Sequence, residues 1–295
     1  MTLHACCRIH RLARFVLITA DASRLAVFYE RAFGCRRLAF EHRCGAEFAK
    51  LMDVRGGAAS LRLGLGNEVI ELLEFAHPGR PYPLGTSSSD LIFQHFAILV
   101  TNMEQAHQRL CVVGGWTAIS VDGPQRLPPG AGAVTAFKFR DPEGHPLELL
   151  AFPDNEAPPH GRAGDPLCFG IDHSAISVAD TSGSVEFYAR MGLTVSARSL
   201  NSGPDQERLD GVREPHVEVT ALAPFRATPH IELLCYRGVQ HSRPDVLRSN
   251  DIAATRLVLE TDAQAPQETA AVVPCGLVDP DGHHLSIVAP HEHGR

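Results

Sequence analysis

The 295-residue sequence lacks the features of three large classes of protein. No apolar run approaches the roughly 20 residues that a membrane-spanning helix needs. Its eight cysteines form no CxxC pair, so we expect reduced, mostly buried thiols rather than a zinc knuckle or a disulfide framework. The formal net charge of -7 argues against a nucleic-acid partner. We therefore expect a cytoplasmic protein that binds neither membranes nor nucleic acid.

The sequence does contain one pattern written four times. Each copy opens with an apolar strand that ends in Asp or Asn, and each closes with a short apolar strand. The opening strands are predicted at residues 15–21, 96–102, 174–180 and 256–262. The closing strands are predicted at residues 69–73, 147–150, 231–234 and 285–288.

Local signals divide the four copies into two kinds. Copies one and three carry capped helix patterns at 23–34 and 182–192, each stopped by glycine. Copies two and four share an Asp-Pro-x-Gly-His turn at 141–145 and 279–283. Copy two has its own helix at 103–113, whereas 262–272 is short, contains a proline, and is expected to form a turn or a stub.

The alternating order suggests that a unit of two modules has been duplicated. A segment rich in Pro and Gly at 153–165 is the expected boundary between the halves. We therefore predict two domains, 12–153 and 166–290. Their modules are predicted at residues 12–77, 93–153, 170–237 and 252–289.

Metal-ligand chemistry is confined to the two middle copies. Among the strand residues, only these copies have both a His at the head of the opening strand and a Glu at the centre of the closing strand. A strand places alternate side chains on one face, so Glu148 and Glu232 point away from their apolar neighbours. Burying a carboxylate is costly unless it is paired or bound to a cation. The four heads are Arg14, His95, His173 and Thr255, and the four centres are Glu71, Glu148, Glu232 and Ser286.

The repeat resembles the vicinal oxygen chelate superfamily, which includes glyoxalase I, extradiol dioxygenases and bleomycin-resistance proteins. The residues that carry the resemblance are 95–102, 139–149, 171–180 and 186–193. The resemblance implies an α+β fold of four βαβββ modules forming two cupped mixed β-sheet barrels, the glyoxalase/dioxygenase fold. It also implies a metal held inside a barrel by strand heads and by the Glu of closing strands.

The choice of module pairs decides whether a complete metal site exists. Pairing one with two places Arg14 among the ligands, and Arg14 would form a salt bridge with Glu71 instead of binding a metal. Pairing three with four leaves one His and one Glu. Single-chain glyoxalases, which this chain resembles, pair inner with inner and outer with outer modules. We therefore predict one site for Fe2+, Mn2+, Co2+, Ni2+ or Zn2+, and an emptied twin. The predicted ligands are His95, Glu148, His173 and Glu232.

The resemblance favours a metal-dependent isomerase or lyase of glyoxalase type. Its small substrate would be chelated through vicinal oxygens, with Glu148 or Glu232 as the catalytic base that shuttles a proton. The first alternative is an Fe(II)-dependent dioxygenase, although Lys138 and Gly276 stand where such enzymes keep a Tyr. The second alternative is a metal-free small-molecule-binding or resistance protein.

Other residues have less specific interpretations. The polar segment 201–210 is expected to be a loop, either on the surface or closing over a substrate. The histidines of the two turns are expected to serve those turns, and the role of His230 is left open. The chain is expected to be a monomer or a homodimer. The substrate contacts proposed for the polar segment are Asn201, Gln206 and Arg208.

Overall fold

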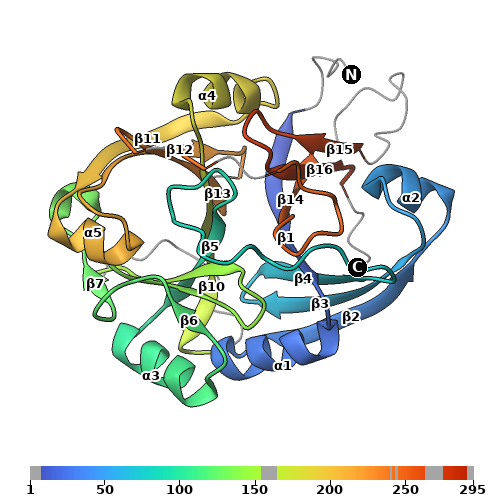
Figure 1. The fold of residues 1–295 in the computed structure, drawn as a ribbon, viewed down its shortest axis with the longest axis horizontal. Helices are drawn as coiled ribbons and strands as arrows, with labels where there is room; N and C mark the ends of the chain where they lie inside the picture. The colour runs from blue at the N-terminus through green and yellow to red at the C-terminus, as the bar shows by residue number, and fades with distance from the viewer. Residues whose placement is uncertain are drawn as a thin grey trace.

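The computed structural model describes residues 8–153, 165–226, 228–239, 241–242, 245–262 and 275–290. These residues form two curved mixed sheets with helices on their outer sides (Figure 1). One sheet has the strand order β15-β16-β14-β1-β4-β3-β2. The other has the order β11-β12-β13-β10-β5-β9-β8-β6, with β7 beside β8. The predicted α+β fold of two cupped mixed sheets is confirmed.

The first sheet, called the outer barrel, combines the first and last modules of the chain. Its elements from the first module are β1 (Ile9–Thr19), α1 (Ala22–Phe33), β2 (Arg36–Arg43), α2 (Ala46–Met52), β3 (Ala58–Leu65) and β4 (Glu68–Phe75). Its elements from the last module are β14 (Arg256–Thr261), β15 (Cys275–Val278) and β16 (His284–Val288).

The second sheet, called the inner barrel, combines the two middle modules. The second module supplies β5 (Gln94–Val100), α3 (Met103–Val113), β6 (Thr117–Ala118), β7 (Gln125–Arg126), η1 (Pro129–Ala131), β8 (Thr135–Arg140) and β9 (Pro146–Ala151). The third supplies β10 (Cys168–Ser177), α4 (Thr181–Ala189), β11 (Thr194–Ser202), α5 (Pro204–Asp210), β12 (His216–Ala223) and β13 (His230–Tyr236).

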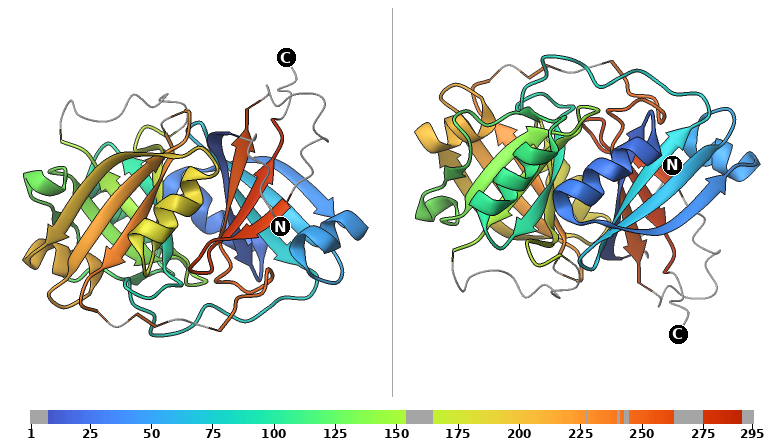
Figure 2. Two further views of the ribbon diagram at one scale, coloured as in Figure 1. Left: turned by 90° about the horizontal axis from the view of Figure 1, so that it is seen from above. Right: turned by 90° about the horizontal axis from the view of Figure 1, so that it is seen from below.

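The opening strands join the modules in the predicted way. Strand β1 runs antiparallel to β14, and β5 runs antiparallel to β10. Figure 2 shows the two barrels side by side, with the blue and red ends of the chain together in one of them. Inner modules therefore pair with each other, and so do outer modules. Both sheets contain strands from both predicted domains, and the boundary residues 154–164 lie outside the described residues, so the division into 12–153 and 166–290 stays a prediction.

Helices α1 and α4 begin at equivalent aspartates. Asp21 accepts a hydrogen bond from the backbone N–H of Arg24, and Asp180 accepts from Ser182 and Gly183. Such N-caps satisfy backbone donors that a helix start leaves free. Tyr29 of α1 and Tyr188 of α4 are completely buried in the core.

These two tyrosines also fasten one module to the next. The hydroxyl of Tyr29 donates to Asp141 in the turn of the second module, and that of Tyr188 donates to Asp279 in the turn of the fourth, both at 3.1 Å. The histidines that end these turns, His145 and His283, donate through Nε2 to strand carbonyls 2.9 and 3.0 Å away. Within the turns, their backbone N–H groups donate to Asp141 and Asp279, which agrees with the predicted turn role.

Some local predictions need correction. The segment 201–210 is the end of β11 followed by helix α5, which begins with a proline and is too short for a clear helical period. The thiols of Cys44 and Cys111 are free but exposed, so the expectation of mostly buried thiols fails for them. Beyond Asp262, the predicted stub at 262–272 lies outside the described residues.

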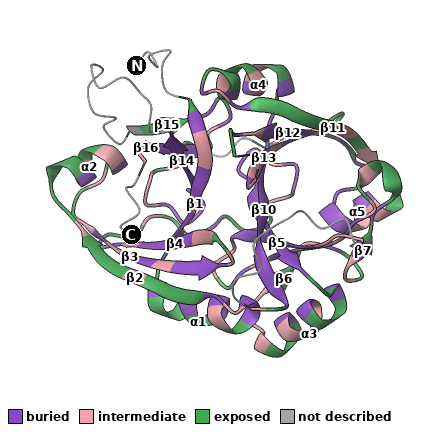
Figure 3. Cartoon of the chain, turned by 180° about the vertical axis from the view of Figure 1, so that it is seen from behind, coloured by how far each residue is buried: buried purple, intermediate pink, exposed green. Residues whose placement is uncertain are grey.

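Burial follows the layers of the fold. Figure 3 shows the central strands of both barrels as largely buried, whereas the edge strands β2 and β11 are mostly exposed. None of the helices in the described ranges has the length and apolar character needed to cross a membrane.

Candidate metal centre

The inner barrel brings the four predicted ligands to one face of its sheet. Glu148 pairs with Ala97, and Glu232 pairs with Ala175, so each carboxylate lies beside the residue two positions after a His. Because side chains alternate along a strand, each Glu faces the same side as that His. His95 in turn lies opposite Ala175 across the β5–β10 contact, which brings the two modules together.

Three of these side chains meet closely. The distance from His95 Nε2 to Glu148 Oε2 is 3.0 Å, and the distance from His173 Nε2 to the same oxygen is 3.5 Å. Ligand atoms of His95, Glu148 and His173 all lie within 4.8 Å of one another, and all three residues are buried. Glu232 approaches this group through His173, with its Oε2 3.6 Å from His173 Nε2.

These separations fit a bound divalent ion. Two N or O ligands about 2.1 Å from one ion lie roughly 3.0–3.4 Å apart when the angle between them is octahedral or tetrahedral. Glu148 lies 3.0 Å from His95 and 3.5 Å from His173, at or close to this range, and Glu232 comes near it only through His173, at 3.6 Å. Imidazole and carboxylate together suit Fe2+, Mn2+, Co2+, Ni2+ or Zn2+.

A neighbouring carboxylate orients His173. Its Nδ1 lies 3.0 Å from Asp172 Oδ2, which leaves Nε2 pointing at the other ligands. A carboxylate that holds the far nitrogen of a ligating His fixes its tautomer and ring orientation. Asp172 directly precedes His173 in the sequence, but adjacency alone does not predict that its carboxylate orients the ring.

The charges of the metal-free group are distributed unevenly. Burial would lower the pKa of His173, but Glu232, Asp172 and Glu148 outweigh it and raise that pKa well above its usual value. Burial lowers the pKa of His95, and Glu148 offsets this only in part. Burial would raise the pKa of Glu148, but hydrogen bonds from His173 and His95 hold it well below the usual range. Of the two ligand histidines, His173 is therefore the one that is more readily protonated when no metal is bound.

The two glutamates differ in their surroundings. The side chain of Glu148 is 7% exposed and contacts both histidines, whereas that of Glu232 is 22% exposed. The second oxygen of Glu232 lies 3.4 Å from His230 Nε2. The structure thus places His230, which the sequence left open, beside the more accessible carboxylate.

A cavity of about 380 Å³ opens from this group. The predicted contacts Asn201 and Gln206 line it, but Arg208 does not. The guanidinium of Arg208 instead bonds Gln125 and Asp205. Apolar side chains cover much of the wall, among them Leu127, Val134, Ala136, Leu150 and Leu209.

A buried lysine also lines this cavity. Lys138 on β8 pairs across the sheet with Glu148, and its Nζ lies 2.7 Å from Asp210 Oδ1 in α5. Burial would lower the pKa of Lys138, but the Asp210 and Glu148 charges raise it instead. The sequence marked Lys138 only as a departure from a dioxygenase pattern. Its inward direction follows from alternation along β8.

The outer barrel carries arginines at the equivalent strand positions. Glu71 pairs with Val16, two residues after Arg14, and Ser286 pairs with Val258, two residues after Arg256. Arg256, and not the predicted Thr255, therefore occupies the position of a ligating His. The prediction of Thr255 is wrong by one residue, and a shift of one residue reverses the face of a strand.

The buried carboxylate of the outer barrel is held by positive charge. Arg14 Nε lies 3.1 Å from Glu71 Oε2, which confirms the predicted salt bridge, and Arg43 Nη2 lies 2.9 Å from Glu71 Oε1. Ser60 donates to the same carboxylate at 2.7 Å. Arg256 is buried beside neutral groups such as Ser249, and this burial lowers its pKa to about 10.

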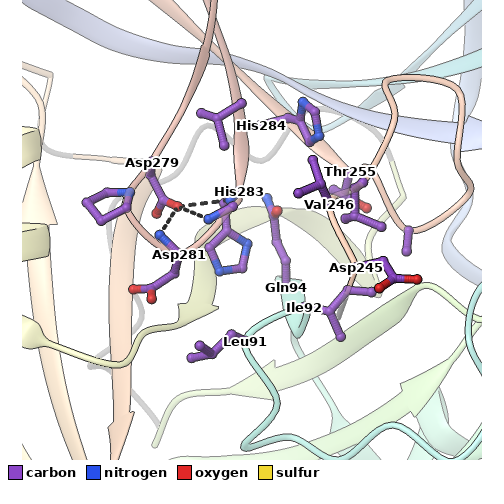
Figure 4. Close-up of a pocket in the computed structure, with 15 residues that line it drawn as sticks. Leu91, Ile92, Gln94, Asp245, Val246, Thr255, Asp279, Asp281, His283 and His284 are labelled. Atoms are coloured by element: carbon purple, nitrogen blue, oxygen red, sulfur yellow. Dashed lines mark hydrogen bonds between the residues drawn. The ribbon is translucent and has the colours of Figure 1, made fainter. Parts of the chain in front are cut away.

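Thr255 lines a different cavity, of about 240 Å³, next to the turn of the fourth module. Figure 4 shows Gln94 and His283 facing its centre. The carboxylate of Asp279 accepts backbone hydrogen bonds from residues 281–283, which commits it to the turn. This cavity is separate from the His–Glu group.

Comparisons with known proteins agree with this architecture. Residues 11–149 match the family model described as Glyoxalase/Bleomycin resistance protein/Dioxygenase superfamily, which confirms the resemblance seen in the sequence. No curated protein matches the chain.

Two solved structures share the fold over nearly the whole chain. Glyoxalase I from Zea mays is 19% identical, with a TM-score of 0.58, and the match covers 95% of this chain and 92% of that one. A protein from Bacillus subtilis subsp. subtilis str. 168, named "putative dioxygenase", is 11% identical, with a TM-score of 0.56 and coverages of 96% and 86%.

Proposed function

We propose that the inner barrel is the site of a metal-dependent isomerase or lyase of glyoxalase type. The match of residues 11–149 to the Glyoxalase/Bleomycin resistance protein/Dioxygenase superfamily model supports this proposal. One observation carries the proposal. The ligand atoms of His95, Glu148 and His173 converge within 4.8 Å of one another in a buried cavity, and Glu232 joins them through its 3.6 Å contact with His173. The substrate is a small oxygenated molecule.

The residues that would hold the ion are His95, Glu148, His173 and Glu232, and Asp172 would keep the ring of His173 in place. When bound, the ion would supply a Lewis acid for two vicinal oxygens of the substrate. Burial of His95, Glu148 and His173 in the barrel limits the access of bulk water and strengthens their electrostatic interactions.

We propose Glu232 rather than Glu148 as the base. Glu148 is committed to both histidines, whereas Glu232 is more exposed and has a second partner in His230. Glu232 would take a proton from the carbon beside a carbonyl, leaving the electron pair on the substrate, and would return the proton to the adjacent carbon. The step is redox-neutral and needs no further reactant.

Metal analysis of the purified protein tests the proposal most directly. We expect His95→Ala and His173→Ala to lose the metal of the wild-type protein, while His42→Ala, at an exposed His of the outer barrel, keeps it. Full metal occupancy in both inner variants would refute the inner site. Glu232→Gln should retain metal more fully than Glu148→Gln and yet show no turnover.

The closest part of the cluster favours a second candidate. His95, Glu148 and His173 form a group of two His and one carboxylate, which is the ligand set of many non-haem Fe(II) oxygenases. Oxygen uptake by the Fe(II)-loaded protein with aromatic diols would favour this dioxygenase-type activity. Ligand binding by chelator-treated protein without turnover would favour a metal-free binding protein.

A further inference from the structure

We propose that the inner cavity selects an uncharged substrate, which carries no anionic group beyond its chelating oxygens and donates a hydrogen bond to the side-chain oxygen of Gln206. This inference rests on the proposed function and names the class of substrate for the same site. It follows from three features of the cavity: one amide with a fixed orientation, one lysine whose charge is already balanced, and a largely apolar wall.

The first feature is the amide of Gln206, which lies on α5 and is only 4% exposed. Its Nε2 donates to Asp210 Oδ2 at 2.7 Å. A carboxylate only accepts hydrogen bonds, so the amide cannot be turned round. Its Oε1 is buried and has no partner among the described residues. A buried acceptor without a partner costs free energy, and a substrate hydroxyl or N–H would remove that cost.

Asn201 offers a second polar group to the same cavity. It lies at the end of β11, just before α5, and its Oδ1 also has no partner within the described chain. The two amides therefore give one end of the cavity the means to bind a neutral polar substituent. Neither brings a charge.

The second feature is the charge balance around Lys138, the one Lys or Arg among the described lining residues. Its Nζ lies 2.7 Å from Asp210, which is buried and also holds Gln206. Four carboxylates in and behind the wall outnumber the single ammonium of Lys138. A bound divalent ion, with the histidines neutral as its ligands, would still leave a net charge of minus one. A substrate carboxylate or phosphate would find no free cation. The four carboxylates are Glu148, Asp172, Asp210 and Glu232.

The third feature is the apolar wall. Leu127, Val134, Ala136 and Leu150 line the cavity and pack with Leu209 of α5 in one buried cluster. Such a wall favours a ring or a short aliphatic body between the chelating oxygens and the donor group. A glutathione adduct, which carries two carboxylates, falls outside this class.

Three related chelators test the inference. Allomaltol, kojic acid and comenic acid present the same vicinal oxygens on one ring and differ in a single substituent, which is methyl, hydroxymethyl or carboxylate. Their Kd values for the Zn2+-loaded protein would be measured by calorimetry and corrected for their affinity for free Zn2+. We expect kojic acid to bind roughly three- to tenfold more tightly than allomaltol, as one added hydrogen bond allows. Comenic acid should bind most weakly.

Variants assign the effect to particular residues. Gln206→Leu should bring the ratio of kojic acid to allomaltol affinity to about one. Arg208→Leu, on the same helix but outside the cavity, should leave that ratio unchanged. Asp210→Asn frees the charge of Lys138 and should improve the binding of comenic acid relative to the other two. Circular dichroism and thermal denaturation would establish that each variant is folded.

The outcomes separate this inference from the function on which it rests. Absence of Zn2+-dependent binding for all three chelators would overturn the proposed metal site and the inference with it. Metal-dependent binding in which comenic acid is tightest, or in which Gln206→Leu leaves the ratio unaltered, would overturn the inference alone. The expected ranking, lost in Gln206→Leu and kept in Arg208→Leu, would support it.

Discussion

The inner and outer barrels use the same four strand positions but fill them with different charges. The inner positions hold two histidines and two glutamates, and the outer positions hold Arg14, Glu71, Arg256 and Ser286. Two guanidinium groups carry as much positive charge as a divalent ion. In the outer barrel, arginine side chains supply the positive charge, and the buried Glu71 carboxylate pairs with Arg14. The comparison shows how a module pair can keep its fold without the ligands for a metal.

The largest expected effect concerns Glu71. Glu71→Gln would leave Arg14 and Arg43 without their carboxylate in a buried site, which should lower the free energy of unfolding by about 3–5 kcal/mol. Urea denaturation would measure the loss, and the metal content should not change. A neutral effect on stability would show that the ion pairs of the outer barrel do not take the place of the proposed metal.

The second prediction uses the opposite pH responses of the two barrels in chelator-treated protein. In the outer barrel, burial and then the Arg256 charge lower the pKa of His284 to about 4. The pKa of His284 is lower in the folded state than in the unfolded state. Its contribution to the free energy of unfolding is therefore complete above pH 6.5 and is lost as the pH falls through 4. This loss is on the order of 3 kcal/mol.

His173 in the inner barrel should behave in the opposite way. Its pKa is raised, so its contribution to stability is present below pH 6.5 and is lost as the pH rises through the folded value. Urea denaturation across this pH range would compare the wild type with His284→Gln, whose acid limb should be flatter. An identical acid limb would contradict the assignment to His284.

The third prediction concerns the carboxylate behind His173. Asp172→Asn should weaken metal binding by about 10- to 100-fold, because the ring of His173 loses its orienting partner. Competition with a chromogenic chelator would measure this affinity. Asp53→Asn removes the same charge at an exposed left-handed position, which Asn tolerates, and should leave the affinity unchanged.

The smallest expected effect tests what the two halves of the chain share. Tyr29→Phe and Tyr188→Phe each remove one buried hydrogen bond to a turn aspartate, at about 1 kcal/mol. The two losses, measured by urea denaturation, should be similar. Each of these bonds joins one barrel to the other, so a much larger loss for one tyrosine would mean that the two links are not equivalent.

Much of the fold and of the candidate metal site could be predicted because the signals in the sequence are local. Strand heads, capped helices and Asp-Pro-x-Gly-His turns recur at fixed spacing, and the completeness of the ligand set pointed to the correct module pairing. The same signals failed where a shift of one residue in strand register decides which side chain faces the interior of the barrel. Arg256 and Thr255 are neighbours with opposite directions, and only the pairing of Val258 with Ser286 distinguishes them.

Features that depend on distant contacts could not be predicted. Nothing in the two Ile/Leu-Glu-Leu-Leu strands distinguishes Glu148 from Glu232, because the difference comes from the histidines that surround each carboxylate. Helix α5 is short and polar, and it is held in place by contacts such as Ser120 and Lys138 from another module. Gln206 therefore becomes recognisable only once the barrel has closed.

The pairing of inner with inner modules also determines the order in which the two barrels can fold during synthesis on the ribosome. All strands of the inner barrel lie between Gln94 and Tyr236, so this barrel can close while the last module is still being made. Strand β1 must wait for β14, which pairs with it from the far end of the chain. An unpaired strand edge invites association with other chains. A frameshift late in the reading frame would therefore spare every proposed metal ligand and still yield an aggregation-prone product.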